Sequence, residues 1–323
     1  MVYLLHAAAS TTLPLMKVAS MLLSIFFNDI YAKVKGVSPR TKQIYGHTFN
    51  QFDRYLERPA MVVDLTDVNV GGFLSWRRAQ TYRGKPVRST TVLKDRAHLL
   101  ALSALAFQKR QLEEALVLPP FRAAPRVPRG YTQDDVEKLI RYAQTLPGRV
   151  AGVASSWWWS SLFRFLYETG ARIGETMALR WDYVELADQR VTLIAETRKL
   201  HTRDIERYVS HELASQLQLN INGPSALVWP WDRPANSKYR NLQSICRAAG
   251  VVPRGFHSFR KCAASYVAAA AGPAAASELL DHSDTGALFK KHYCDSRIVN
   301  NGSRAVDILP TLNVAPFLPQ NQG

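Results

Sequence analysis

The chain has 323 residues, 47% of them hydrophobic, which is enough for two ordinary domains that each bury a core. Its formal net charge of +15 is unevenly spread. Residues 1–130 hold 19 Lys and Arg against 8 Asp and Glu, whereas residues 131–323 hold 22 against 18. The excess in the first part favours a polyanionic partner such as a phosphate backbone. On charge alone, a basic protein with no specific polyanionic partner is an equal alternative.

The composition also argues against several classes of protein. The three cysteines have no CxxC spacing, which argues against a disulfide scaffold and a zinc site, so we expect a reducing cytoplasm, no metal and no cofactor. The apolar stretch Met1–Met16 is interrupted by polar residues and lacks a basic leading region, and the uncharged run Val18–Asn28 is too short to cross a bilayer. We therefore expect neither a signal peptide nor a membrane span.

The first part of the chain is predicted to be helical. Apolar residues recur at helical spacing, and Ser38-Pro39 is typical of an N-cap followed by proline in the first turn. The expected helices are Leu15–Tyr31, Pro39–Glu57, Asp67–Ala79 and Ser89–Gln108, with a polar turn at Thr81–Pro86. Residues 15–118 should thus form an all-helical, basic domain after a tail of residues 1–14.

Four prolines between Leu118 and Gly130 predict an extended linker over residues 119–130. A second domain of residues 131–312 and a tail of residues 313–323 follow. In this domain, Thr132 is the expected cap of a helix, and Ser155–Glu168 is an apolar helix. Its tryptophans, Trp157–Trp159, are more typical of a core than of a base-stacking platform.

Two short strand-like runs, Arg190–Glu196 and Ile205–Ser210, flank the polar stretch Thr197–Asp204 and predict a β-hairpin. Helical sequence resumes at Asn241. The second domain is therefore expected to be mainly α with a small β-sheet, an α+β fold.

Four short segments of the second domain carry groups suited to chemistry on an anionic oxygen. They hold, in chain order, Arg172 with Glu175, His257 with Arg260, His282, and Tyr293. The first two pairs are three residues apart, so each pair would share a helix face. Taken singly, each segment has a simpler explanation: a surface ion pair, a chance HxxR spacing, or a half-buried tyrosine.

Together and in this order, these residues resemble the catalytic signature of the tyrosine recombinases, the phage-integrase-type enzymes. The run from Glu168 to Glu175, followed by Leu179-Arg180-Trp181, is similar to family sequence as well. Residues Gly36–Thr41 with Tyr45 resemble the start of the family's core-binding domain. The resemblance spans residues 15–304. It implies a site-specific recombinase or integrase that cleaves and rejoins DNA strands through a 3′-phosphotyrosyl link.

The chemistry explains why such residues are wanted. An arginine donates two hydrogen bonds from a planar fork and stays charged, so Arg172 and Arg260 are expected to clamp the scissile phosphate. His257 and His282 would add donors or assist proton movement, and Glu175 would give structural support. Tyr293 would be the nucleophile, which needs no ATP because the phosphotyrosine conserves the bond energy.

Two further assignments rest on the resemblance. Tyr293 is preferred to Tyr266, which lies in an apolar helix and is expected in the core. The family's general acid is a lysine on a β-hairpin turn, and Lys199 falls in the predicted turn, with Arg198 and His201 as its competitors.

Two departures from the family pattern concern the placement of Tyr293. Asp281 stands where a glycine usually precedes the histidine, which puts a carboxylate near the site, and His282 and Tyr293 are eleven residues apart, a longer step than is common. A catalytically weak or inactive DNA-binding protein of the same fold is therefore one alternative. A type IB topoisomerase is another, although the short single-linker layout and the integrase-like N-terminal domain argue against it.

The resemblance also implies partners. We expect double-stranded DNA, and a homo-oligomer, a tetramer on two DNA sites, in the cytoplasm in association with the nucleoid. The segment Ser296–Leu312, after the tyrosine, is expected to dock on a neighbouring protomer.

Overall fold

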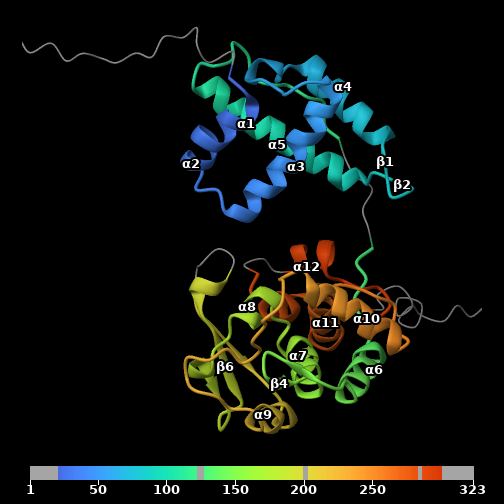
Figure 1. The fold of residues 1–323 in the computed structure, drawn as a ribbon. Coiled ribbons are helices and arrows are strands. Elements are labelled where there is room, and N and C mark those ends of the chain that lie inside the picture. Colours follow the sequence, from blue (N-terminus) through green and yellow to red (C-terminus); the bar gives the residue numbers. More distant parts are fainter. Residues whose placement is uncertain (1–20, 122–126, 199–202, 283–285, 300–323) are drawn as a thin grey trace, which may run out of the picture. The chain divides into compact units, whose positions relative to one another are not determined.

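The computed structural model describes residues 21–121, 127–198, 203–282 and 286–299 (Figure 1). The chain divides into two compact units, residues 1–125 and residues 126–323. Each unit has its own hydrophobic core. In the described part of the chain, no helix has the length and apolar character to cross a membrane, and no cluster of His, Cys, Asp and Glu is suited to a metal ion.

The first unit is built from helices, as predicted. A helical segment with a π-helical turn in its middle comes first, and three longer helices follow. Their bounds are α1 Leu23–Phe26, a π-turn Phe27–Tyr31, α2 Ala32–Val34, α3 Pro39–Leu56, a 3-10 turn Val62–Asp64, α4 Asp67–Ala79 and α5 Ser89–Gln108. The expected N-cap is confirmed, because the Ser38 hydroxyl accepts from the N–H of Thr41 (3.2 Å) at the start of α3.

The predicted polar turn of this unit contains a small hairpin. Strands β1 (Thr81–Tyr82) and β2 (Lys85–Pro86) pair antiparallel around Arg83 and Gly84, which both have positive φ. No alternation of apolar residues marks this hairpin, because both strands are exposed and only two residues long.

A buried polar group joins three helices of the first unit, α3, α4 and α5. The Thr48 hydroxyl donates to the Asp95 carboxylate (2.8 Å) and contacts Nδ1 of His98 (2.8 Å), while Arg77 and Lys94 pair with the same carboxylate (both 3.2 Å). Because the hydroxyl has one proton and gives it to Asp95, Nδ1 of a neutral His98 carries the hydrogen in the second contact.

The second unit has helices around a small sheet, so the predicted α+β fold is confirmed. Its helices are α6 Gln133–Gln144, α7 Ser155–Thr169, α8 Ile173–Met177, α9 His211–Gln218, α10 Ser237–Ala248, α11 His257–Leu279 and α12 Ala287–His292. Thr132 caps α6 as expected, with Asp135 completing a capping box. Trp158 and Trp159 on α7 are buried, which confirms the core interpretation of the tryptophan run.

The main sheet lies at one side of this unit, away from α6 (Figure 1). It has the order β5 (Val184–Glu185), β6 (Arg190–Leu193) and β7 (Ile205–Tyr208), all antiparallel. The predicted hairpin is β6–β7, although β6 ends at Leu193 and a 3-10 turn, Ala195–Thr197, follows. A second, two-stranded hairpin pairs β3 (Arg149–Val150) with β4 (Val153–Ala154) before α7.

Helix α11 is broken near its end, and this break sets the place of α12. Gly272 has φ 88° and ψ 169°, which are not helical, and Pro273 follows it. Gly286, at the start of α12, lies against this break. A Cβ at Gly286 would be 2.8 Å from the Cβ of Pro273, and its φ of 118° is one that other residues rarely adopt. The close approach therefore requires glycine.

Protonation of His98 is expected to destabilise the first unit. Burial and the nearby Lys94 lower the pKa of His98 to about 4 from an ordinary 6.5. Because the unfolded chain takes up this proton at a higher pH than the folded chain, stability is full above about pH 6.5 and falls as the pH drops toward 4. Hydrogen exchange of peptides from α3 and α5, followed over a series of urea concentrations, measures the free energy of unfolding of this unit. It should fall by about 1–2 kcal/mol between pH 7 and pH 5. An equal loss in a His98→Gln variant would contradict this.

Candidate active site

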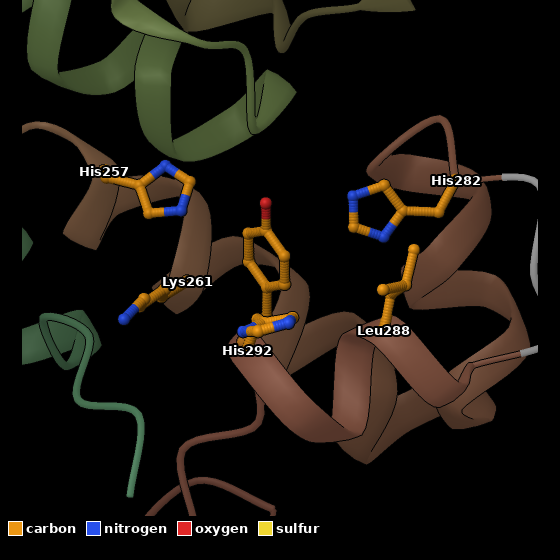
Figure 2. Close-up of a pocket in the computed structure, with 6 residues that line it drawn as sticks. His257, Lys261, His282, Leu288 and His292 are labelled. Carbon is orange, nitrogen blue, oxygen red and sulfur yellow. The ribbon is translucent and has the colours of Figure 1, made fainter. Parts of the chain in front are cut away.

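Tyr293 directly follows α12 and is its C-terminal cap. Its backbone N–H donates to the carbonyl of Phe289 (2.8 Å), and the residue is only 9% exposed. The phenol ring lies between the imidazoles of His257 and His282, with its centroid 5.2 Å from each. Figure 2 shows the imidazoles of His257 and His282 on opposite sides of the pocket. The fold thus brings three of the predicted residues together.

These three side chains line a cavity of about 410 Å³ together with Lys261, Leu288 and His292 (Figure 2). Sequence reasoning assigned no role to Lys261 or His292. A signal was present for both, because Lys261 is one helical turn after His257 on α11, and His292 directly precedes Tyr293. The cavity is therefore more basic than the predicted set alone.

Arg260 places a buried cation next to the tyrosine. Its guanidinium carbon is 5.8 Å from the centroid of the Tyr293 ring, and the residue is 2% exposed. Its two terminal nitrogens donate to the carbonyls of Gly170 and Leu280 (2.5 Å each). Burial and the nearby Arg172 lower the pKa of Arg260 to about 10, so the guanidinium stays charged at neutral pH.

Arg172 reaches the same region from the turn between α7 and α8. Gly170 ends α7 with φ 61°, and Arg172 then caps α8 rather than lying within it. The Glu175 carboxylate, 3% exposed, accepts from the Arg172 side chain (2.8 Å) and from its backbone N–H (2.9 Å). Because both carboxylate oxygens are used in this way, Glu175 orients the Arg172 guanidinium, whose side chain remains 31% exposed.

His257 is the first residue of α11, one turn before Arg260 and Lys261. Partial burial and the surrounding Arg260, Lys261 and Arg172 cations lower its pKa to about 4. The imidazole is therefore neutral at physiological pH. None of the described residues that line the cavity is acidic, and the cations Arg260, Lys261 and Arg172 surround His257, an arrangement suited to binding an anion.

The predicted general acid, Lys199, and its competitor His201 lie outside the described residues. Arg198, the other competitor, is 3% exposed and is bound to the Asp281 carboxylate. Its Nε also lies 3.9 Å from Glu175. These contacts place Arg198 in a buried ion-pair network, and it does not line the cavity at Tyr293.

The backbone conformation and the contacts of Asp281 explain why an aspartate can stand where the family usually has glycine. It has φ 49°, a left-handed conformation that glycine adopts most easily and that aspartate tolerates. Its carboxylate is bound by Arg198 and by Arg203 (2.7 Å). The expected negative charge beside the site is thus paired with two arginines.

The segment after Tyr293 is fixed by Asp295, which sequence reasoning missed. The Asp295 carboxylate is fully buried and accepts from the N–H of Gly130 (2.9 Å), from Arg129 (3.1 Å) and from Arg297 (2.7 Å). In addition, the Ser265 hydroxyl on α11 donates to the carbonyl of Tyr293 (3.2 Å) and accepts from the N–H of Asp295 (3.1 Å). The backbone of the tyrosine is thereby tied to α11 and to the start of the second unit.

Gly130 completes this junction. Its carbonyl accepts from Arg297 (2.9 Å), and a Cβ at this position would lie 2.9 Å from the backbone nitrogen of Cys262 and 3.2 Å from the carbonyl of Ser258. The chain therefore crosses the first turns of α11 in close backbone contact. These partners are more than 100 residues apart in sequence, so no local spacing could have indicated them.

Comparison with known proteins identifies the family. The sequence model of the phage integrase family matches residues 130–297, just over half of the chain. The chain belongs to the phage integrase family. This match covers Arg172, His257, Arg260, His282 and Tyr293.

A Haemophilus influenzae protein, named as an integrase/recombinase, is 27% identical to the present chain over 160 residues. The match covers 47% of this chain and 41% of the relative, so the chain spans less than half of the relative's length. Among solved structures, a lambda integrase has a TM-score of 0.62 at 17% identity, covering 84% of this chain and 78% of its own. The Tn1549 transposon integrase has a TM-score of 0.60 at 13% identity, covering 88% and 99%. The structural matches establish a shared fold.

Removal of the Asp295 charge is expected to loosen the Tyr293 segment. Burial alone would raise the pKa of Asp295, but Arg297 and the N–H groups of Gly130 and Arg297 hold it well below its ordinary value. Its contribution is therefore present at neutral pH and is lost only in acid, as the pH falls below the ordinary carboxyl pKa of about 4.

An Asp295→Asn variant should lose about 2 kcal/mol in the free energy of unfolding at pH 7, since the part-exposed Arg129 and Arg297 lose the buried carboxylate that pairs with them. Urea denaturation measures this. The matched control is Asp188→Asn, whose carboxylate is 67% exposed and 4.0 Å from Arg190, and which should change by less than about 0.5 kcal/mol. Equal effects in the two variants would refute the assignment.

Proposed function

We propose that this chain is a site-specific DNA recombinase that cuts and rejoins double-stranded DNA through a covalent bond between Tyr293 and a 3′ phosphate. The observation that carries the proposal is the tyrosine ring set between two imidazoles, beside a buried arginine, at a cavity that Lys261 also lines. A scissile phosphodiester is an anion that gains charge as the fifth oxygen approaches, so such a cavity stabilises the transition state more than the ground state.

In the proposed mechanism, the clamp on the phosphate is formed by Arg172 and Arg260. The Arg172 guanidinium is oriented by Glu175 and still part-exposed, so it has donors to offer a phosphate oxygen. Arg260 is held by two carbonyls and needs little rearrangement on binding. A preorganised donor of this kind contributes about 3 kcal/mol to lowering the barrier.

The chemical step transfers the phosphate to the protein. The Tyr293 oxygen forms a bond to phosphorus, and its proton passes to a neutral imidazole of the flanking pair. The bond from phosphorus to the 5′ oxygen breaks, and its electron pair leaves with that oxygen, which takes a proton from the general acid, assigned to Lys199. Attack by the 5′ hydroxyl of a second strand on the phosphotyrosine reverses these transfers and frees Tyr293.

The first unit supplies a surface for the DNA backbone. A groove of about 840 Å³ runs beside the β1–β2 hairpin, and Tyr82 at its edge is 69% exposed. The groove is lined by the cations Arg54, Arg77, Arg83, Lys85, Arg88 and Lys94. We assign it to sequence-independent contacts with phosphates, whose strength falls with salt.

The solved relatives support DNA as the partner and an oligomeric assembly. The lambda integrase structure is a tetramer bound to a Holliday junction, and the Tn1549 integrase was solved in complex with transposon right-end DNA. By extension, we assign to this chain a homotetramer on two DNA sites, acting in the cytoplasm on nucleoid DNA. Residues 296–312, which are described only to 299, are assigned to contacts between protomers.

A Tyr293→Phe variant should bind DNA but form no covalent adduct. Duplexes selected for binding from a random library would be nicked near the bound site and incubated with the protein, and the adduct would be read on a denaturing gel. Tyr266→Phe is the matched control, because its hydroxyl accepts from the N–H of Gln133 (3.1 Å) at the start of α6 and takes no part in the proposed step. Adduct in the Tyr293 variant would overturn the nucleophile assignment. Tight binding without adduct in the wild type would favour a DNA-binding protein that does no chemistry.

A further inference from the structure

One carboxylate joins the two ends of the turn between β6 and β7. Asp281 binds Arg198, the last described residue before the turn, through one oxygen, and Arg203, the first described residue after it, through the other (2.7 Å). Arg198 also donates to the carbonyl of Arg203. The two ends of the turn are therefore held to each other and to the residue that precedes His282.

The contacts of Asp281 with Arg198 and Arg203 belong to a larger buried network. Arg198 is 3% exposed, and its Nε is 3.9 Å from Glu175, the carboxylate that orients Arg172. On β7, Arg207 donates to the carbonyl of Leu279 (2.7 Å), two residues before Asp281. The two ends of the turn and the strand after it are thus fixed to the end of α11, where the chain continues to His282.

The backbone at Asp281 indicates that its side chain is there for these contacts. With φ 49° the position favours glycine, and a side chain here strains the backbone. Glycine would satisfy the turn but could not bind the two arginines. The carboxylate is 13% exposed and is matched by one buried and one exposed guanidinium, so the pairing is specific and only partly screened by solvent.

We propose that Asp281 is a positioning residue: it holds Arg198 and Arg203, the two ends of the β6–β7 turn, to the residue before His282, and thereby supports proton delivery to the leaving 5′ oxygen by the general acid assigned to this turn. This inference rests on the proposed function. It uses the described flanks of the turn, Arg198 and Arg203, and it needs no contact of Lys199 itself. Loss of the contacts of Asp281 would leave Tyr293 and the phosphate-binding arginines in place. It would impair proton delivery alone.

The test compares two DNA substrates that differ in the leaving atom. In the first, the 5′ bridging atom is oxygen, which departs only if it is protonated, since its conjugate acid is about as weak as water with a pKa near 15.7. In the second, sulfur replaces this oxygen and departs as a thiolate, because a thiol has a pKa of about 8.5. A defect confined to proton delivery is therefore seen with oxygen and disappears with sulfur.

Asp281→Gly is the main variant, because glycine suits the backbone and should preserve folding, which a thermal melt would verify. Adduct formation at saturating DNA should slow about tenfold or more on the oxygen substrate and by less than about twofold on the sulfur substrate. Asp281→Asn tests the charge with a side chain of the same size. Arg203→Gln removes one partner at a 73% exposed position, and its effect should not add to that of Asp281→Gly.

The controls separate this inference from the proposed function. Tyr293→Phe should be inactive on both substrates, and Lys199→Ala should be rescued by sulfur. Equal slowing of Asp281→Gly on both substrates would overturn the inference. If the sulfur substrate rescues Asp281→Gly but not Lys199→Ala, the positioning role of Asp281 is supported. The general acid is then a different group of the turn. Absence of any adduct in the wild type would refute the proposed function and the inference with it.

Discussion

The candidate site depends on the buried guanidinium of Arg260. Its two donors bind the carbonyl at the end of α7 and the carbonyl at the end of α11, so one side chain joins the two turns from which Arg172 and His282 emerge. A buried charge is tolerable only when hydrogen bonds replace its lost water, and these carbonyls provide them. The same bonds hold the cation beside Tyr293, so the structural and electrostatic demands on Arg260 are met by one geometry.

The cations gathered at this site repel one another, and nearby carboxylates partly offset this repulsion. Arg260 and His257 both have lowered pKa values, and burial and neighbouring positive charge are the causes in each case. The carboxylates near the site, Glu175 and Asp281, are already paired with arginines and offset this charge from outside the cavity. A bound phosphate would supply the missing negative charge, and it would raise both pKa values toward their ordinary range.

Features that depend on residues close together in the chain could be predicted from the sequence. The caps at Ser38 and Thr132, the bounds of α4 and α5, and the β6–β7 hairpin follow from residues close together in the chain. The ordered motifs also indicated His257, Arg260 and His282, which lie around Tyr293, but not Lys261 and His292. The junction of Asp295 with Gly130 and the clamp of Asp281 on Arg198 could not be predicted, because each joins segments that only the folded chain brings together. The sequence marked Asp281 as unusual, but only its φ and its partners explain it.

The contact of Gly286 with the break in α11 bears on how this family can vary in length. Helix α12 begins at a glycine seated on Pro273, and the residues after Tyr293 are held by Asp295 and Ser265. Tyr293 is thus held by contacts on both sides of it in the chain, and its place does not follow from the number of residues after His282. Insertions or deletions between His282 and Gly286 would change the length of the connection and leave the tyrosine where it is. The eleven-residue step from His282 to Tyr293 therefore does not by itself decide where the tyrosine lies.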